Sequence, residues 1–328
     1  MAAGLRGEDG ISGRPAMILV VKSGGEAALP EWRACFADYA PGLDLRWWDD
    51  PSLDPAAVDY ALVWDPEPGR LARMPRLKAI FGSGAGVDLI AADPLLPRHL
   101  PLVRCVPPEA TQRMGEFVVW AVLSLNKDAR RMAIAQSQRE WDYFEPPFAA
   151  AARTVGVMGL GAMGQRAAEM LRAIGIPVIG WSRSRKSIPG MECFAGEEEL
   201  PAFLSCCEVL VCLLPATPET RGILAAPLIS CLPRGAGLVQ VGRGVQQVLP
   251  DILAALDDGQ LSGAVLDVFE PEPLPPDSPA WTHPRVTVTP HVASLPSRRE
   301  RARYVAACIA RCERGEPLPN LYDHARGY

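Results

Sequence analysis

Short apolar runs alternate with helix-like stretches along the chain from Ala16 onward. A first series of five runs predicts strands at AMILVV, LDLRWW, VDYALVW, LKAIFG and LVRCV. A second series of six follows: RTVGVMG, IPVIGWS, EVLVCLL, GLVQV, GAVLDVF and RVTVT. Apolar strands separated by helices are typical of parallel sheets covered by helices, so we predict an α/β fold with two Rossmann-like, doubly wound parallel-sheet domains.

Between the two series lies a helix-like stretch from about Glu109 to Gln138, followed by a polar, aromatic segment, WDYFEPPF, which we expect to be an exposed connector. After Pro296, an apolar stripe recurs at helical spacing, at Val305, Cys308, Ile309 and Cys312. Because the second sheet is complete with six strands, we expect this last helix to return to the first domain. That domain is then discontinuous, and two chain crossings form a hinge.

These patterns predict three parts of the chain. Residues 1–15 form a flexible tail, residues 16–107 together with 296–328 form a flavodoxin-like substrate domain, and residues 108–295 form a dinucleotide-binding Rossmann domain.

A glycine-rich turn follows the first strand of the second series. Gly159, Gly161 and Gly164 form GxGxxG between an apolar strand and an amphipathic helix. The first glycine permits the tight turn, the second lets the backbone approach a pyrophosphate, and the third allows the helix to pack closely. A dinucleotide at the helix N-terminus is therefore predicted.

The next strand, IPVIGWS, ends where an NAD site carries an acidic residue that binds the adenosine ribose. Here the sequence continues as Ser182, Arg183, Ser184, Arg185. An arginine fork binds a phosphate that a carboxylate would repel, so we predict NADP(H), with weaker use of NAD(H).

Polar side chains also follow the last three strands. Arg243 follows GLVQV, Glu272 follows GAVLDVF, and His291 follows RVTVT. The carboxyl ends of parallel strands meet at one edge, where ligands bind. Arg243 can hold and polarise a carbonyl or carboxylate, His291 can donate a proton, and Glu272 can favour the imidazolium, with Glu270 as its competitor. This set predicts hydride transfer to a 2-oxo acid.

Composition limits the possible partners. The 328 residues carry a net charge of -5, with 48% hydrophobic and 22% charged residues. A broad nucleic-acid surface needs excess positive charge, and a membrane span needs about 20 apolar residues in a row, so neither partner is expected. The nine cysteines show no metal-binding spacing and predict reduced thiols in a cytoplasmic protein without a metal.

At these residues the chain resembles the D-isomer-specific 2-hydroxyacid dehydrogenase family. VGRG, DVFEPEPLP and TPHVAS match its arginine, acidic and histidine motifs, and LKAIFGSGAGVD, WSRSRKS and the terminal ARGY are similar to its NADPH-dependent glyoxylate/hydroxypyruvate reductases of the A type. The resemblance implies a homodimer that reduces glyoxylate to glycolate and hydroxypyruvate to glycerate.

The resemblance also implies substrate contacts outside the Rossmann domain. It assigns the backbone of Ala85 and Gly86, in the turn GSGAGVD, to the substrate carboxylate, beside Arg243 and His291, although a purely structural turn is the alternative. Trp48 matches an aromatic residue that borders the substrate, although a purely structural role in the core is the alternative. The full set of predicted cofactor contacts is Gly159, Leu160, Gly161, Ala162, Met163, Gly164, Ser182, Arg183, Ser184, Arg185, Leu214, Pro215, Thr220, Val241, Gly242, Arg243, Asp267 and His291.

Two positions depart from the family pattern. Gln240 stands where asparagine is usual, and Leu249 stands near a usual acidic residue, so loop geometry or dimer contacts can differ. Two other functions stay open: a reductase for a larger 2-oxo acid, and a non-catalytic protein that senses a dinucleotide.

Overall fold

The computed structural model describes residues 17–328, so the predicted tail at residues 1–15 and Ala16 lie outside the described residues. The described chain forms two compact units. The first unit takes in the chain up to Ser83, Leu89–Val103 and Arg301–Leu321. The second unit takes in Gly84–Asp88, Arg104–Glu300 and Tyr322–Tyr328. The predicted domain boundaries stay a prediction.

The first unit is built on a parallel five-stranded sheet with the order β2-β1-β3-β4-β5. Its central strand β3 is buried at all six positions, as expected for a parallel strand covered on both faces. All five strands predicted from the first apolar series are present. They are β1 (Met17–Lys22), β2 (Leu43–Trp47), β3 (Val58–Val63), β4 (Ala79–Gly82) and β5 (Leu102–Val103).

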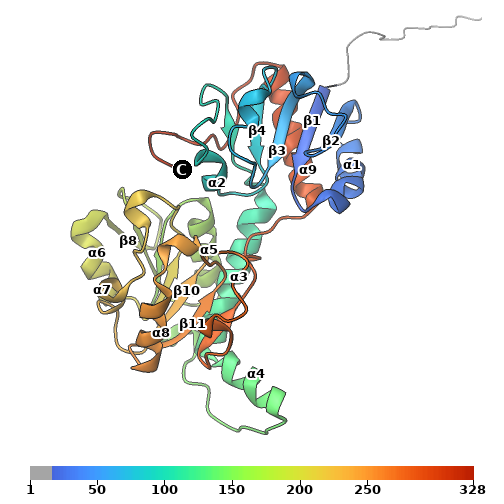
Figure 1. Ribbon diagram of the computed structural model, residues 1–328. Coiled ribbons are helices and arrows are strands. Elements are labelled where there is room, and N and C mark those ends of the chain that lie inside the picture. Colours follow the sequence, from blue (N-terminus) through green and yellow to red (C-terminus); the bar gives the residue numbers. More distant parts are fainter. Residues whose placement is uncertain (1–16) are drawn as a thin grey trace, which may run out of the picture. The chain divides into compact units, whose positions relative to one another are not determined.

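The last helix of the chain, α9 (Arg298–Glu313), packs on this first sheet. Its buried residues Val305, Cys308 and Ile309 share a core with Leu19 and Tyr60 of the strands. Figure 1 shows α9, in red, beside the blue strands of the same unit. The prediction that the C-terminal helix completes the first domain is confirmed. The other helices of this unit are η1 (Glu26–Ala28), α1 (Leu29–Ala37), η2 (Pro55–Ala57), η3 (Leu71–Arg73) and α2 (Asp88–Ala91).

The second unit contains a parallel seven-stranded sheet with the order β12-β11-β10-β9-β6-β7-β8. The prediction of six strands was wrong by one, because β8 was missed. This edge strand has the sequence ECFA with an exposed Glu192 and no fully buried position, so it lacks the apolar run that revealed the others. The strands are β6 (Val155–Met158), β7 (Val178–Ser182), β8 (Glu192–Ala195), β9 (Val209–Cys212), β10 (Ala236–Gln240), β11 (Leu261–Leu266) and β12 (Val286–Val288).

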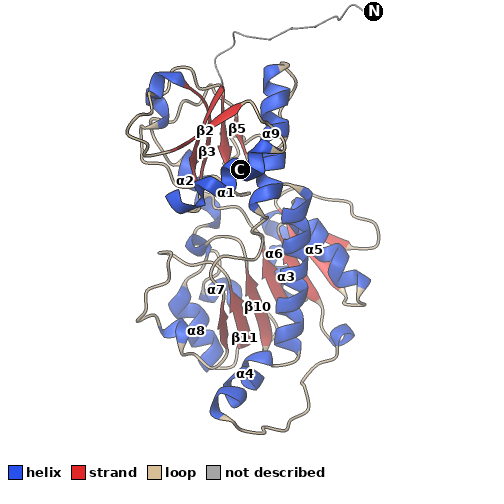
Figure 2. Ribbon diagram, turned by 90° about the vertical axis from the view of Figure 1, so that its right-hand side faces the viewer, coloured by secondary structure: helices blue, strands red, loops and turns tan. Residues whose placement is uncertain are grey.

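Helices cover both faces of the second sheet, and each face has its own core. One core includes residues of α3 (Pro108–Asn126) and α5 (Ala162–Ala173). The other includes residues of α6 (Gly196–Ser205), α7 (Ala226–Ile229) and α8 (Leu249–Asp257). Figure 2 shows α3 and α8 on opposite sides of β10 and β11. The unit also contains η4 (Ala150–Ala152), η5 (Pro218–Thr220), η6 (Gly244–Gln246) and η7 (Pro279–Trp281).

The long helix predicted over Glu109–Gln138 is in fact two helices. α3 ends at Asn126, and α4 begins at Ala129. Between them Asp128 has the left-handed φ of 52°, which an aspartate tolerates better than most residues but which no α-helix can contain. The prediction of one helix was wrong because helical periodicity continues across this single-residue break. The connector after α4 is exposed as predicted, with Trp141 95% and Tyr143 85% exposed.

Candidate functional site

The glycine-rich turn joins β6 to α5 in the second unit. Gly159 has a φ of 112°, and a Cβ there would lie 2.8 Å from the carbonyl oxygen of Leu213. A Cβ on Gly164 would overlap the carbonyl oxygen of Gly159, so the helix packs directly on the turn. A Cβ on Gly161 would meet nothing within 4 Å. The three glycines therefore provide a turn, an open approach and a close packing contact, as a dinucleotide-binding turn requires.

The open space at Gly161 leaves room for a dinucleotide beside the backbone. Gly161 is the N-cap of α5, whose first N–H groups have no partner within the helix. The backbone there fits the pyrophosphate of a dinucleotide. The flanking predicted residues lie on the same turn, with Leu160 buried and Ala162 and Met163 in the first turn of α5.

The arginines after β7 point to different partners. Arg183 donates a hydrogen bond from Nη2 to the hydroxyl of Tyr328 at 2.7 Å. Arg185 donates to the carbonyl oxygen of Cys193 at 2.8 Å and forms an ion pair with Glu199. A backbone hydrogen bond from Ala195 and the bond from Arg185 hold the pKa of Glu199 below its usual value. Arg185 is therefore tied to β8 and α6, and a cofactor contact there stays a prediction.

Two serines complete this strand end. Ser182 is buried, and its hydroxyl donates to the carbonyl oxygen of Ser184 at 2.8 Å. This bond turns the chain at the end of β7. No acidic residue occupies the four positions from Ser182 to Arg185.

The loops after β9 and β10 are joined by hydrogen bonds. Gln246 donates from Nε2 to the carbonyl oxygens of Leu214 and Pro215, both at 2.9 Å. Thr220 donates to the carbonyl oxygen of Pro215 at 2.7 Å. A Cβ on Gly242 would lie 3.0 Å from the carbonyl oxygen of Leu214. These contacts bring the predicted residues of the two loops, including Val241, to one edge of the sheet.

Arg243 is held by an acidic residue that sequence reasoning missed. Its Nε donates to Asp88 Oδ1 at 2.9 Å, and its Nη1 donates to the carbonyl oxygen of Gly242 at 2.7 Å. Asp88 closes the motif GSGAGVD, of which only the glycine turn enters the prediction from sequence. The signal was an acidic residue directly after that turn.

The same turn places Gly86 against Arg243. A Cβ on Gly86 would overlap Nη2 of Arg243, so the backbone approaches the guanidinium more closely than any other residue type allows. Among the described residues, no hydrogen-bond acceptor is found for the N–H groups of Ala85 and Gly86. The structure therefore brings together Ala85, Gly86 and Arg243, all predicted to bind the substrate.

His291 contacts Glu272. The distance from His291 Nδ1 to Glu272 Oε2 is 2.8 Å, and Glu272 Oε1 accepts the N–H of Phe269 at 2.9 Å. Burial raises the pKa of Glu272, but the hydrogen bonds from His291 and Phe269, with the charge of Arg243, outweigh it and lower this pKa overall. Glu270 instead lies 3.4 Å from Arg221 at the surface. The carboxylate and imidazole thus form one pair.

Buried Asp267 holds the loop that carries the histidine. Its carboxylate accepts hydrogen bonds from the Thr289 hydroxyl at 2.6 Å and from the N–H groups of Val292 and Ala293 at 3.0 Å. Its carbonyl oxygen accepts the N–H of His291 at 2.8 Å, and His291 has a φ of 54°. These bonds fix a backbone conformation that a histidine rarely adopts. The predicted cofactor contact of Asp267 stays a prediction.

Gln240 and Leu249, the two residues that depart from the family pattern, both make defined contacts within the second unit. Gln240 is fully buried, donates to the carbonyl oxygen of Arg243 at 2.9 Å and accepts the N–H of Gly242 at 3.2 Å. It therefore fixes the loop that presents Arg243. Leu249 starts α8 and packs on the core beneath that helix.

Trp48 lies in the first unit and is fully buried. Its indole N–H donates to Glu67 at 2.5 Å, and the guanidinium of Arg70 lies 4.5 Å from the ring centroid. Burial raises the pKa of Glu67, but hydrogen bonds from Lys22 and Trp48 outweigh it and lower this pKa to about 2. Trp48 therefore has the contacts of a core residue, and its predicted place beside the substrate stays a prediction.

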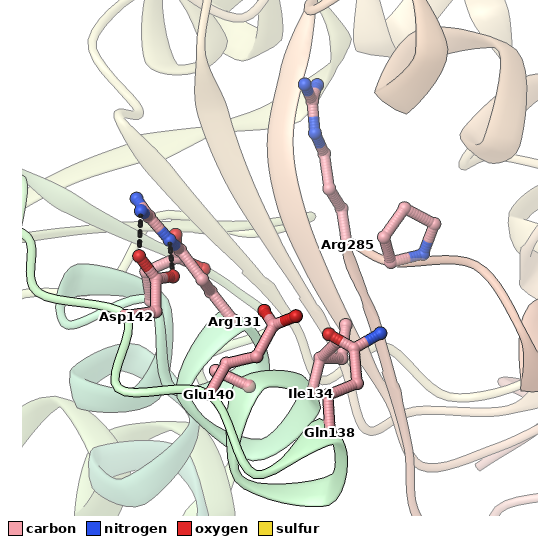
Figure 3. Close-up of a pocket in the computed structure, with 9 residues that line it drawn as sticks. Arg131, Ile134, Gln138, Glu140, Asp142 and Arg285 are labelled. Atoms are coloured by element: carbon pink, nitrogen blue, oxygen red, sulfur yellow. Dashed lines mark hydrogen bonds and ion pairs between the residues drawn. The ribbon is translucent and has the colours of Figure 1, made fainter.

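A separate hollow of about 250 Å³ lies beside α4. Figure 3 shows Arg131 paired with Asp142 at its edge, with Arg285 on the other side. Arg131 donates two hydrogen bonds to Asp142, at 2.5 and 2.7 Å. None of the predicted site residues lines this hollow.

Fold and site geometry together are those of a dinucleotide-dependent oxidoreductase. The family model for "D-isomer specific 2-hydroxyacid dehydrogenase, NAD binding domain" matches residues 119–293. The chain belongs to the D-isomer specific 2-hydroxyacid dehydrogenase family. No helix in residues 17–328 combines the length and apolar character needed to span a membrane.

Solved structures of similar proteins cover nearly the whole chain. A D-isomer specific 2-hydroxyacid dehydrogenase from Xanthobacter autotrophicus Py2, in complex with NADPH and MES, is 42% identical with a TM-score of 0.88, over 95% of this chain and 100% of that one. The NADPH-dependent glyoxylate/hydroxypyruvate reductase from Sinorhizobium meliloti, in complex with NADP and sulfate, is 41% identical with a TM-score of 0.86, over 95% and 100%. A probable 2-hydroxyacid dehydrogenase from Rhizobium etli CFN 42, in complex with NADP, is 40% identical with a TM-score of 0.85, over 95% and 99%.

Proposed function

We propose that this protein is an NADPH-dependent reductase of small 2-oxo acids, which reduces glyoxylate to glycolate and hydroxypyruvate to D-glycerate. The observation that carries the proposal is the 2.8 Å pair of His291 and Glu272 at the sheet edge that also presents Arg243. These residues follow β12, β11 and β10, which are neighbours in the sheet. The similar reductase from Sinorhizobium meliloti supports the choice of substrate.

Each side chain has a separate task. When bound, reduced nicotinamide supplies the hydride. Arg243, steadied by Asp88, binds and polarises the carbonyl or carboxylate of the 2-oxo acid. The N–H groups of Ala85 and Gly86, beside that guanidinium, can bind the substrate carboxylate.

His291 moves the proton. Nδ1 faces Glu272, so Nε2 donates the proton to the substrate oxygen. The Glu272 carboxylate stabilises the imidazolium before transfer and orients the ring. The resulting alcohol leaves as a 2-hydroxy acid, and the same set run backwards oxidises that acid.

Cofactor choice follows from the strand end after β7. Arg183 presents a guanidinium where a 2′-phosphate would lie, and no carboxylate from Ser182 to Arg185 competes with it. Two of the similar structures hold NADP, and one holds NADPH. NADH is expected to serve less well.

The experiment is a kinetic panel with purified protein. Oxidation of NADPH and of NADH is followed with glyoxylate, hydroxypyruvate and a bulky 2-oxo acid such as phenylpyruvate. We expect both small acids to be reduced, with a kcat/KM for NADPH at least about tenfold above that for NADH, since one charged hydrogen bond to the phosphate is worth that much. Preference for phenylpyruvate would favour the larger-substrate alternative, and no oxidation of NADPH would favour a sensor.

We also propose that the protein is a cytoplasmic homodimer. Large aromatic or apolar side chains of α3, α4 and the connector after α4 are exposed: Trp120, Met132, Trp141 and Tyr143. A second copy would cover such side chains, and light scattering would then report twice the 35.4 kDa chain mass. No disulfide joins cysteines within residues 17–328, which supports a reducing compartment.

A further inference from the structure

The segment Tyr322–Tyr328 belongs to the second unit, although the helix before it packs on the first sheet. A Cβ on Gly327 would lie 3.6 Å from the side chain of Thr217, in the loop after β9. Tyr328, one residue on, contacts Arg183 after β7. The segment therefore reaches from one loop to the other at the sheet edge where the adenosine end of a dinucleotide binds.

The end of this segment is folded on itself. Asp323 Oδ1 accepts the N–H of Ala325 at 2.9 Å, and the Asp323 carbonyl oxygen accepts the N–H of Gly327 at 2.9 Å. The Asp323 N–H donates to the carbonyl oxygen of Tyr328 at 3.2 Å. Gly327 has a φ of 81°, which glycine adopts without strain. This turn sets the position of the Tyr328 ring before any ligand arrives.

Tyr328 orients Arg183 in two ways. Its hydroxyl oxygen accepts a hydrogen bond from Nη2 at 2.7 Å, and the guanidinium carbon lies 5.2 Å from its ring centroid. A guanidinium beside an aromatic ring keeps its remaining N–H groups available for a phosphate. Among residues 17–328, no other hydrogen-bond partner of Arg183 is found.

The tyrosine hydroxyl has a hydrogen still to donate. Its oxygen is the acceptor for Arg183, and no described residue accepts its proton. Glu219 influences Arg183 only through its charge, and its own carboxylate is engaged by Thr217. A ligand that meets both the guanidinium and the phenol must therefore accept hydrogen bonds and carry negative charge, as a phosphate monoester does.

We propose that Tyr328 is a specificity-determining residue that binds the 2′-phosphate of NADP(H) together with Arg183. The proposal rests on the NADP(H) use proposed above. The phenol O–H and the guanidinium N–H groups bind phosphate oxygens side by side. NAD(H) has a ribose hydroxyl at that place and gains little from the pair.

Binding of adenosine 2′,5′-bisphosphate and of 5′-AMP, measured by calorimetry, tests this role without turnover. Tyr328→Phe keeps the ring and removes the hydroxyl. We expect it to weaken the bisphosphate about five- to tenfold, the size of one exposed hydrogen bond to a charged group, and to leave 5′-AMP within about twofold. Tyr143→Phe, the same change at an 85% exposed tyrosine, is the matched control and should alter neither ligand.

The possible outcomes distinguish failure of the Tyr328 proposal from failure of the proposed NADP(H) use. If the unmodified protein prefers the bisphosphate and Tyr328→Phe binds it equally well, Tyr328 has no such role while NADP(H) use stands. Equal weakening of both ligands would show a structural role and overturn the proposal. If the unmodified protein binds both ligands equally, NADP(H) use fails, and the role of Tyr328 fails with it.

Discussion

The contact between Glu272 and His291 depends on the ionisation of the Glu272 carboxylate. Folding lowers the pKa of Glu272, so its carboxylate is ionised at neutral pH. At pH values above the ordinary pKa of a glutamate, the ionised carboxylate of Glu272 stabilises the native state. This contribution is lost as the pH falls through the lowered pKa. Ionised Glu272 holds the His291 ring at Nδ1 and so orients it for proton transfer.

Glu272→Gln keeps the side-chain size and removes the charge. The variant should therefore unfold with a smaller free energy than the unmodified protein at neutral pH, because it lacks the ionised carboxylate that His291 and Phe269 stabilise. The difference should shrink as the pH falls through the lowered pKa of Glu272, where the unmodified protein loses the same charge. Chemical denaturation of both proteins at several pH values measures this, and a difference that stays constant down to acid pH would contradict an ionic role of Glu272.

The sequence predicted those functional residues that directly follow a strand. Arg243, Glu272 and His291 each follow an apolar run and stood out for that reason. Asp88 was missed because its partner Arg243 is 155 residues away, and no local pattern encodes such a contact. The clamp made by Asp267 was missed as well, because loop conformation at residues 289–293 depends on a buried carboxylate from another strand end.

At the scale of elements, the turn between β6 and α5 offers two glycines with opposite surroundings. Gly161→Ala adds a methyl group to open space, and its φ of -75° suits alanine. We expect the melting temperature to stay within a few degrees while nucleotide affinity drops about tenfold or more, because the methyl group stands where the pyrophosphate approaches.

Gly164→Ala is the contrasting variant. Its methyl group would overlap the backbone of Gly159, so α5 must shift and both stability and nucleotide binding should fall. Calorimetry and thermal unfolding measure the two effects. Equal melting temperatures for the two variants would contradict this account of the turn.

Elements were predictable where burial imposes a pattern. The predicted strands of both sheets were found because parallel strands covered on two faces are apolar throughout. The edge strand β8 and the break between α3 and α4 were not, since an edge strand needs few apolar residues and Asp128 changes one φ without changing the periodicity.

At the scale of the whole molecule, the second unit joins segments that are distant in sequence. Gly84–Asp88 and Tyr322–Tyr328 both belong to it by their contacts. The first supplies Asp88 and Gly86 to Arg243, and the second supplies Tyr328 to Arg183. The apolar pattern predicted two sheets and the return of α9 to the first sheet. It could not predict that these two short segments join the second unit, because segments of a few residues carry no periodic signal.

The central claim is that His291 donates the proton during reduction. The most direct measurement is kcat for glyoxylate reduction by His291→Gln, with NADPH affinity determined in parallel. The account predicts a kcat about 10²–10⁴-fold below that of the unmodified protein, the usual size of general acid catalysis, with NADPH affinity within a few fold. A kcat close to that of the unmodified protein would contradict it.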